Sequence, residues 1–174
     1  MARLCRSVWS KPNISRKTKM RIYNTTVTQV LLYGAETWPA AASARDAIDV
    51  AQTKFLRRIE GIRWDDFVSN TRLLALTGQT PNSRQVAAQT LRWFGHLVRM
   101  PAETPASTLF NFDPPAHGWK RPRGRPRFRW RDSLTQYLSM IGTGIQEANK
   151  LAQDRSEWRR RVTCLSTLDH QQEH

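Results

Sequence analysis

The sequence predicts an all-α protein in which a small helical bundle is followed by a basic extended linker and a small helical tail. Three observations predict this class. Apolar residues recur at three- and four-residue steps instead of alternating as they do along strands. Serine, asparagine or aspartate precedes several of these stretches, where it can cap a helix, and glycine or proline follows them. The 174 residues suffice for one domain or two small ones.

The first helix is expected to begin after Ser15, which can act as its N-cap, and to run to about Gly34. Its apolar stripe should face a core and consists of Met20, Tyr23, Val27, Val30 and Leu31. Four basic residues crowd its first turns, namely Arg16, Lys17, Lys19 and Arg21. Positive charge there opposes the helix dipole, so it is not placed for local stability. These cations form either a contact surface for an external polyanion or a merely solvated basic face.

Three further helices complete the predicted bundle, which occupies residues 1–100. One runs from Ser43 to about Gly61, and its apolar stripe consists of Ile48, Ala51, Phe55, Ile59 and Ile62. Asn70 should cap a short helix, and Ser83 should cap a longer one that ends near Met100. The core candidates of this longer helix are Val86, Leu91, Phe94, Leu97 and Val98. The last two helices have the outline of a helix-turn-helix, although most such pairs are only packing units.

Residues 101–128 form the predicted linker, because proline, small residues and then arginine replace helical periodicity there. Residues 129–174 form the predicted helical tail. Its first helix begins at Trp130 and ends near Gly142. Its last helix should open with a capping box of Asp154 and Glu157 and bury Trp158.

The most basic stretch joins the linker to the tail. Its seven cations are Lys120, Arg121, Arg123, Arg125, Arg127, Arg129 and Arg131. Prolines hold such a segment extended, so alternate guanidinium groups can follow phosphates or enter a narrow minor groove. Residues 123–126 resemble an AT-hook, which leaves both minor-groove selectivity and backbone binding without base selectivity open. Phe128 and Trp130 suit stacking on unpaired bases, while the spacing of Trp130 to later apolar residues favours a place in a helix core.

Charge gives the strongest compositional indication of a partner. Lys+Arg 28 exceed Asp+Glu 14, for a formal net charge of +14, which attracts polyanions. No stretch approaches the roughly 18 apolar residues of a membrane-spanning helix. The amino terminus also lacks the continuous apolar run of a secretory signal. We therefore expect an intracellular and nuclear chain that binds nucleic acid and has no membrane partner.

Catalytic and metal sites are not expected. Asp65 and Asp66 invite comparison with the paired metal-binding aspartates of polymerases, but no strand alternation surrounds them, so turn or helix capping is the favoured interpretation. The sequence contains Cys 2 and His 4 without the close spacing of a zinc site. We accordingly expect no catalytic residue, no metal and no cofactor.

Several stretches, taken in order, resemble the reverse transcriptases of non-long-terminal-repeat (LINE-type) retrotransposons. Residues 14–38 are similar to the segment just after the palm, generally taken as the thumb, and residues 54–64 are similar to the next block. Residues 91–100, 123–132 and 154–158 resemble the carboxy-terminal tail. The fingers, the palm with its metal-binding aspartates and the endonuclease of the family are missing from this sequence.

The resemblance implies a thumb and tail that grip an RNA template, a DNA primer or their hybrid, without the polymerase activity of the parent family of RNA-directed DNA polymerases. The residues expected to neutralise phosphates are Arg16, Lys17, Lys19, Arg21, Lys120, Arg121, Arg123, Arg125, Arg127, Arg129 and Arg131. Two alternatives stay open. One is a host-domesticated protein-interaction or regulatory nuclear protein whose basic segment is a nuclear-localisation signal. The other is a non-functional remnant of a degraded element.

Overall fold

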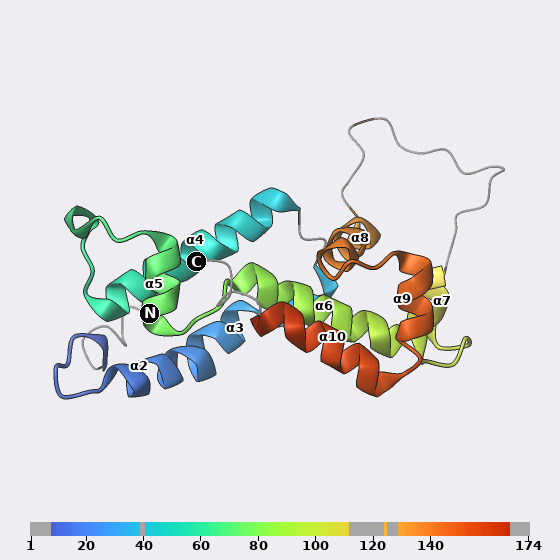
Figure 1. Cartoon of the computed structure of the whole chain (residues 1–174), viewed down its shortest axis with the longest axis horizontal. Coiled ribbons are helices and arrows are strands. Elements are labelled where there is room, and N and C mark those ends of the chain that lie inside the picture. Colours follow the sequence, from blue (N-terminus) through green and yellow to red (C-terminus); the bar gives the residue numbers. More distant parts are fainter. Residues whose placement is uncertain (1–7, 39–40, 112–123, 125–128, 168–174) are drawn as a thin grey trace. The chain divides into compact units, whose positions relative to one another are not determined.

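The computed structural model describes residues 8–38, 41–111, 124 and 129–167. Within these ranges the chain forms helices and no strand, so the predicted all-α class is confirmed (Figure 1). The helices belong to two compact units: residues 1–35 with 42–86 make up the first unit, and residues 36–41 with 87–174 make up the second unit. None of the helices in the described ranges is long and apolar enough to span a bilayer.

The first unit opens with one helical segment in three parts: α2 (Arg16–Ile22), the π-helical turn η2 (Tyr23–Thr28) and α3 (Gln29–Leu31). Ser15 is the N-cap, as predicted, because its Oγ accepts a hydrogen bond from the backbone N–H of Thr18 at 3.2 Å. Gly34 follows with φ of +67°, a left-handed conformation that suits glycine and ends the segment where the sequence predicted.

The π-helical turn changes which side chains of this segment face inward. Met20 and Tyr23 are buried, as predicted, and Val27 is half-buried. Val30, however, is 79% exposed, whereas Thr28 and Leu32 are buried. The predicted stripe is wrong at Val30, because hydrogen bonds from residue i to i+5 place more residues in each turn and rotate the sequence pattern beyond η2.

Two further helices complete the main part of the first unit, α4 (Ala42–Glu60) and α5 (Asn70–Thr77), with the 3-10 turn η4 (Trp64–Asp66) between them. Gly61, with φ of +72°, ends α4 as predicted. The cap of α5 is Ser69 and not Asn70, since Ser69 Oγ accepts from the N–H of Arg72 at 3.1 Å. Asn70 is already helical, and its Oδ1 accepts from Arg57 Nη2 at 2.9 Å.

The core of the first unit gathers apolar side chains from α2, η2, α4 and α5 together with the segment before α2. Its buried members are Trp9, Met20, Tyr23, Leu56, Ile59 and Leu73. Removing these large side chains from water is the main stabilising contribution to such a unit. The first basic helix is therefore anchored through its inner face, which leaves its outer face free for other contacts.

Hydrogen bonds attach α4 to the start of α6 (Asn82–Val98) within the first unit. Gln52, which is buried, donates to the carbonyl of Thr80 at 2.9 Å and accepts from the N–H of Asn82 at 2.8 Å. Asp49 accepts from both the N–H and the Oγ of Ser83, at 2.8 and 2.6 Å. Ser83 is thus a helical residue bound to α4, and its predicted role as N-cap is wrong by two residues, because α6 begins at Asn82 and Pro81 precedes it.

The second unit contains the remainder of α6 with α7 (Pro105–Asn111), α8 (Trp130–Met140), α9 (Ile145–Leu151) and α10 (Arg155–Thr167). Of the predicted core residues of α6, Val86, Leu91, Phe94 and Leu97 are buried, and Val98 is half-buried. α7 lies inside the predicted linker, which is therefore not structureless throughout. Its Phe110 ring packs edge-on against Phe94 and Trp130, at centroid distances of 5.9 Å in both cases, so tertiary contacts hold a helix that the local sequence pattern does not predict.

Two tryptophans fix the packing of the second unit through their indole N–H groups. Trp130 Nε1 donates to the carbonyl of Glu36 at 2.7 Å, and Trp158 Nε1 donates to the carbonyl of Leu91 at 2.9 Å. Trp130 is half-buried at the start of α8, which agrees with the interpretation that it begins a helix core. Trp158 is 2% exposed and packs against Phe94.

The start of α10 confirms the predicted cap but not the full capping box. Asp154 Oδ1 accepts from the N–H groups of Ser156 and Glu157, at 2.8 and 3.2 Å. The Glu157 carboxylate does not hydrogen-bond back to the backbone of Asp154. It instead binds Arg161 at 3.0 Å and also Arg160.

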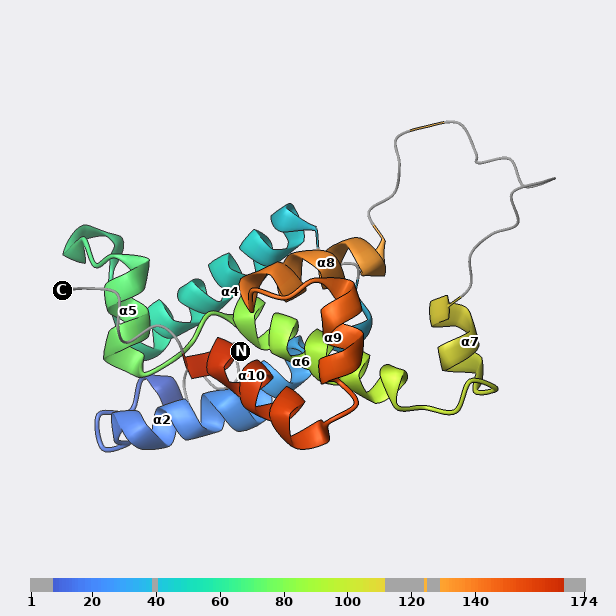
Figure 2. The same cartoon turned by 45° about the vertical axis from the view of Figure 1, so that its right-hand side comes forward.

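In both views of the chain α10 runs alongside the second part of α6 (Figures 1 and 2). The division between the two compact units falls within α6, after Val86.

Candidate nucleic-acid interface

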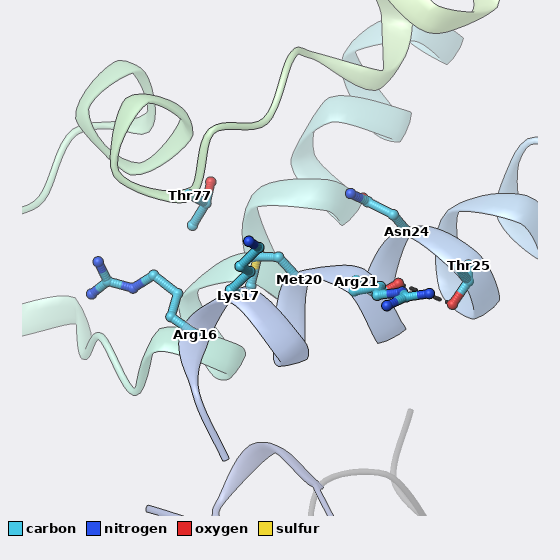
Figure 3. A pocket seen from close by; sticks show the side chains of 7 residues that line it. All are labelled: Arg16, Lys17, Met20, Arg21, Asn24, Thr25 and Thr77. Atoms are coloured by element: carbon cyan, nitrogen blue, oxygen red, sulfur yellow. Dashed lines mark hydrogen bonds between the residues drawn. The ribbon is translucent and has the colours of Figure 1, made fainter.

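Three of the four predicted basic residues of α2 line an open hollow of about 530 Å³ on the first unit (Figure 3). Its lining consists of Arg16, Lys17, Met20, Arg21, Asn24, Thr25 and Thr77. The guanidinium groups of Arg16 and Arg21 extend in opposite directions along the helix, and Thr77 at the end of α5 lies across from them (Figure 3). No carboxylate is part of this lining, so the hollow is positively charged.

Two of the four predicted cations of α2 are engaged by the fold itself. Arg16 Nε lies 2.8 Å from Glu60 Oε2, although the arginine side chain remains 54% exposed. Lys19 Nζ donates to the carbonyl of Trp9 at 2.7 Å and is half-buried. Lys19 therefore ties the segment before α2 to the helix, and Arg16 can offer at most part of its charge to an external anion.

The other two cations of α2 are exposed and remain available. Within the ranges that the structure describes, Lys17 and Arg21 have neither an ion pair nor a side-chain hydrogen bond. They lie four residues apart and hence on the same side of the helix. A pair of unneutralised cations at this spacing can contact neighbouring phosphates of one strand.

The π-helical turn positions the polar end of the hollow. Thr25 Oγ1 donates to the carbonyl of Arg21 at 2.9 Å (Figure 3). Thr26 Oγ1 donates to the carbonyl of Ile22 at 2.6 Å. Such bonds from threonine to the preceding turn compete with the regular helical pattern and bend helices. The run of polar residues after Tyr23 therefore explains the local departure from an α-helix, and it leaves the exposed amide of Asn24 beside Arg21.

The predicted cations of the basic stretch fall in two groups. Lys120, Arg121, Arg123, Arg125 and Arg127 lie outside the described residues. Arg129 is exposed just before α8, and its backbone N–H donates to Asp132 Oδ2 at 2.7 Å. Arg131 Nη2 donates to the carbonyl of Phe110 at 3.0 Å, and its guanidinium carbon lies 5.2 Å from the centre of the Phe110 ring, a cation–π contact. Arg131 thus contributes to packing between α7 and α8.

The paired aspartates have the structural role that the sequence favoured. Asp66 Oδ2 accepts from the N–H of Arg63 at 2.6 Å and caps η4, while Asp65 Oδ1 lies 3.3 Å from Arg63 Nε. Among the described residues no three His, Cys, Asp or Glu side chains gather as metal ligands. Cys164 is exposed on α10 and forms no disulfide with a described residue.

A second basic hollow was not among the predicted sites. It lies in the second unit, measures about 530 Å³, and is lined by Arg92, His96, Arg99, Arg155, Trp158, Arg159 and Thr163. Its signal in the sequence is a polar stripe at helical spacing. Arg92 and His96 are four positions apart on α6, and Arg99 follows three positions later, just after the helix ends. Arg155, Arg159 and Thr163 are separated by four positions each and so lie on one face of α10.

A family model described as a domain of unknown function (DUF6451) matches residues 3–33. The matched stretch includes all four predicted cations of α2 and the π-helical turn. No curated protein and no solved structure matches the chain significantly.

Proposed function

We propose that this chain binds the sugar–phosphate backbone of a polynucleotide, as the thumb and tail of a non-long-terminal-repeat retrotransposon reverse transcriptase would, and that it does so without polymerising. The observation that carries the proposal is the exposed pair of Lys17 and Arg21 beside a hollow that contains no carboxylate. The formal net charge of +14 supports it, because such a field attracts polyanions from a distance.

The kind of contact follows from the donors that remain free. The hydroxyls of Thr25 and Thr77 donate to backbone carbonyls, at 2.9 and 2.8 Å, so they are not spare donors for a ligand. Asn24 retains its amide N–H groups beside the two cations. Cations with one amide donor suit phosphate oxygens, which carry no sequence information. The proposed interface therefore binds backbone without selecting bases.

The salt dependence of binding tests the proposal. Each neutralised phosphate contributes about 0.9 to the slope of log affinity against log salt. If about six cations of α2 and the basic stretch make such contacts, the slope is near −5. Fluorescence anisotropy with labelled duplex DNA, RNA and an RNA–DNA hybrid, each titrated at several KCl concentrations, measures it. A flat response to salt would defeat the proposal.

Paired variants distinguish the α2 interface from net charge alone. The double variant Lys17→Ala/Arg21→Ala should reduce the magnitude of the slope by about 2 and weaken binding at low salt by roughly tenfold or more. The control Lys54→Ala/Arg72→Ala removes the same charge from exposed positions of the first unit. Equal effects of the two double variants would mean that only the total charge matters and that α2 is not the interface.

One observation favours the second candidate, a protein-interaction role. The turn after α4 carries two exposed aromatic side chains, Trp64 at 83% and Phe67 at 88%. Exposed aromatic residues are enriched in protein interfaces. Crosslinked partners that survive nuclease treatment and are lost in Trp64→Ser/Phe67→Ser would support this role, and loss of every partner on nuclease treatment would reject it.

A further inference from the structure

The second basic hollow is built where two helices of the second unit approach closely. At Gly95 of α6 an added Cβ would lie 2.3 Å from Trp158 Nε1, so only glycine permits this approach. The Trp158 ring is 2% exposed and forms an apolar part of the lining. Its N–H is already bound to the carbonyl of Leu91 at 2.9 Å. The polar chemistry of the hollow therefore comes from the residues around the indole.

Those surrounding residues are four arginines and one histidine. Arg92 and His96 come from α6, Arg99 directly follows it, and Arg155 and Arg159 come from α10. In the part of the chain that the structure describes, Arg92, Arg155 and Arg159 have no ion pair and no side-chain hydrogen bond. Arg99 is held in place, because its Nη1 donates to the carbonyl of Ala152 at 2.5 Å.

The nearby acidic residues do not neutralise this cluster. Glu157 is engaged by Arg160 and Arg161, which are not part of the lining. Asp154 is engaged by the first turn of α10, where its Oδ1 also accepts from Ser156 Oγ at 2.6 Å. The lining itself contains no carboxylate. Burial, and to a smaller extent the charge of Arg155, lowers the pKa of Arg99 below its ordinary value.

We propose that this arginine hollow, defined by Arg92, His96, Arg99, Arg155 and Arg159, binds a phosphoryl group of at least two negative charges, such as a terminal phosphate or a pyrophosphate. Planar guanidinium groups bind phosphate oxygens in pairs, and four of them around one hollow match a concentrated charge better than a single phosphodiester does. The volume of about 530 Å³ falls in the range of small-ligand sites and exceeds what one phosphate fills. This site is separate from the α2 interface and does not depend on it.

Thermal unfolding and calorimetry of the full chain with sodium pyrophosphate, at constant ionic strength set with NaCl, test the proposal. Binding to the folded state should raise the Tm by several degrees. The variant Arg155→Gln/Arg159→Gln should weaken pyrophosphate binding by about tenfold or more, because the loss of even one hydrogen bond to a charged group reduces affinity by about that factor. The matched control Lys150→Gln/Arg160→Gln removes the same charge from exposed positions of the second unit outside the lining. Circular dichroism checks that both variants fold, and the single variant Arg92→Gln provides a milder test.

The source of the phosphoryl group is resolved by two oligonucleotides of one sequence, one with a 5′-phosphate and one with a 5′-hydroxyl. A preference for the phosphorylated end that is lost in Arg155→Gln/Arg159→Gln assigns the hollow to a polynucleotide terminus. Pyrophosphate binding with no such preference assigns it to a small phosphate. No rise in Tm with pyrophosphate, or equal loss in the hollow variant and its control, overturns the proposal. Lys17→Ala/Arg21→Ala should leave pyrophosphate binding unchanged, so failure here and failure of backbone binding are told apart.

Discussion

Replacing Gly95 with alanine tests whether the close approach of α6 and α10 holds the second unit together. The new Cβ would lie 2.3 Å from Nε1 and 2.5 Å from Cδ1 of Trp158, far inside the contact distance of about 3.5–4.0 Å. The indole cannot move aside freely, since it is 2% exposed and bound to the carbonyl of Leu91. The variant must therefore displace the ring or separate the helices.

The expected cost combines three contributions. Overpacking of a buried site destabilises by about 1–3 kcal/mol. Loss of the indole hydrogen bond, which leaves a buried donor or acceptor unpaired, costs about 1–3 kcal/mol more. Alanine is more favourable than glycine in a helix interior by about 1 kcal/mol, and this gain partly offsets the two destabilising contributions. The net destabilisation of Gly95→Ala is then about 3 kcal/mol, and for a chain of this size the Tm falls by roughly 10 °C.

Urea unfolding followed by circular dichroism measures this cost, and a second background isolates its cause. In Trp158→Phe the ring is smaller and has no N–H, so Gly95→Ala should cost at least about 1 kcal/mol less there than in the parent chain. Unchanged or higher stability of Gly95→Ala would refute the close-approach argument. An equal cost in both backgrounds would show that Trp158 is not the obstacle.

Two predictions concern groups whose pKa is shifted. The hydroxyl of Ser156 and the N–H groups of Glu157 and Ser156 hold the pKa of Asp154 below its ordinary value. The ionised Asp154 should stabilise the fold above the unfolded-state pKa of about 3.9, and this contribution should be lost as pH falls through the folded-state pKa. The Tm, measured from pH 6 to pH 2, should therefore fall less steeply in Asp154→Asn than in the parent chain. Burial raises the pKa of Tyr23, with Thr28 and Asn82 opposing. The protonated Tyr23 should stabilise the fold fully below the unfolded-state pKa of about 10, and this contribution should be lost as pH rises through the folded-state pKa. The urea midpoint of Tyr23→Phe should therefore depend less on pH between 9 and 11 than that of the parent chain.

The sequence predicted helix starts and core faces correctly where a single residue could perform the role, such as capping a helix or filling the core. Ser15 and Asp154 cap helices because their side-chain oxygens accept from free N–H groups of the first turn. Leu91 and Phe94 of α6 and Trp158 of α10 are buried because helical spacing places each on the apolar face of its own helix. Where two neighbouring residues can perform the same role, as Ser69 and Asn70 can, the sequence does not decide between them.

Features that depend on distant contacts escaped prediction. The π-helical turn arises from competing threonine hydrogen bonds, and it moved Val30 out of the predicted stripe. α7 forms because Phe110 finds Phe94 and Trp130, which are distant in sequence. Whether a single cation is engaged also depends on the fold. Lys19 donates to the carbonyl of Trp9, whereas Lys17 makes no ion pair or side-chain hydrogen bond with the described residues. The arginine hollow escaped prediction because its two stripes lie on helices far apart along the chain.

Residues 36–41 of the second unit lie within the sequence span of the first unit, so the two units become complete at different times during translation. The first unit has all of its residues once residue 86 is available, but the second unit draws Glu36 from far upstream and needs Trp130 and Trp158 from far downstream. At about 5–20 residues per second, Leu91 and Phe94 leave the ribosome several seconds before Trp158 can cover them. During that interval one end of α6 is already bound to Gln52 and Asp49 while the other exposes apolar surface, which makes the nascent chain a substrate for chaperones.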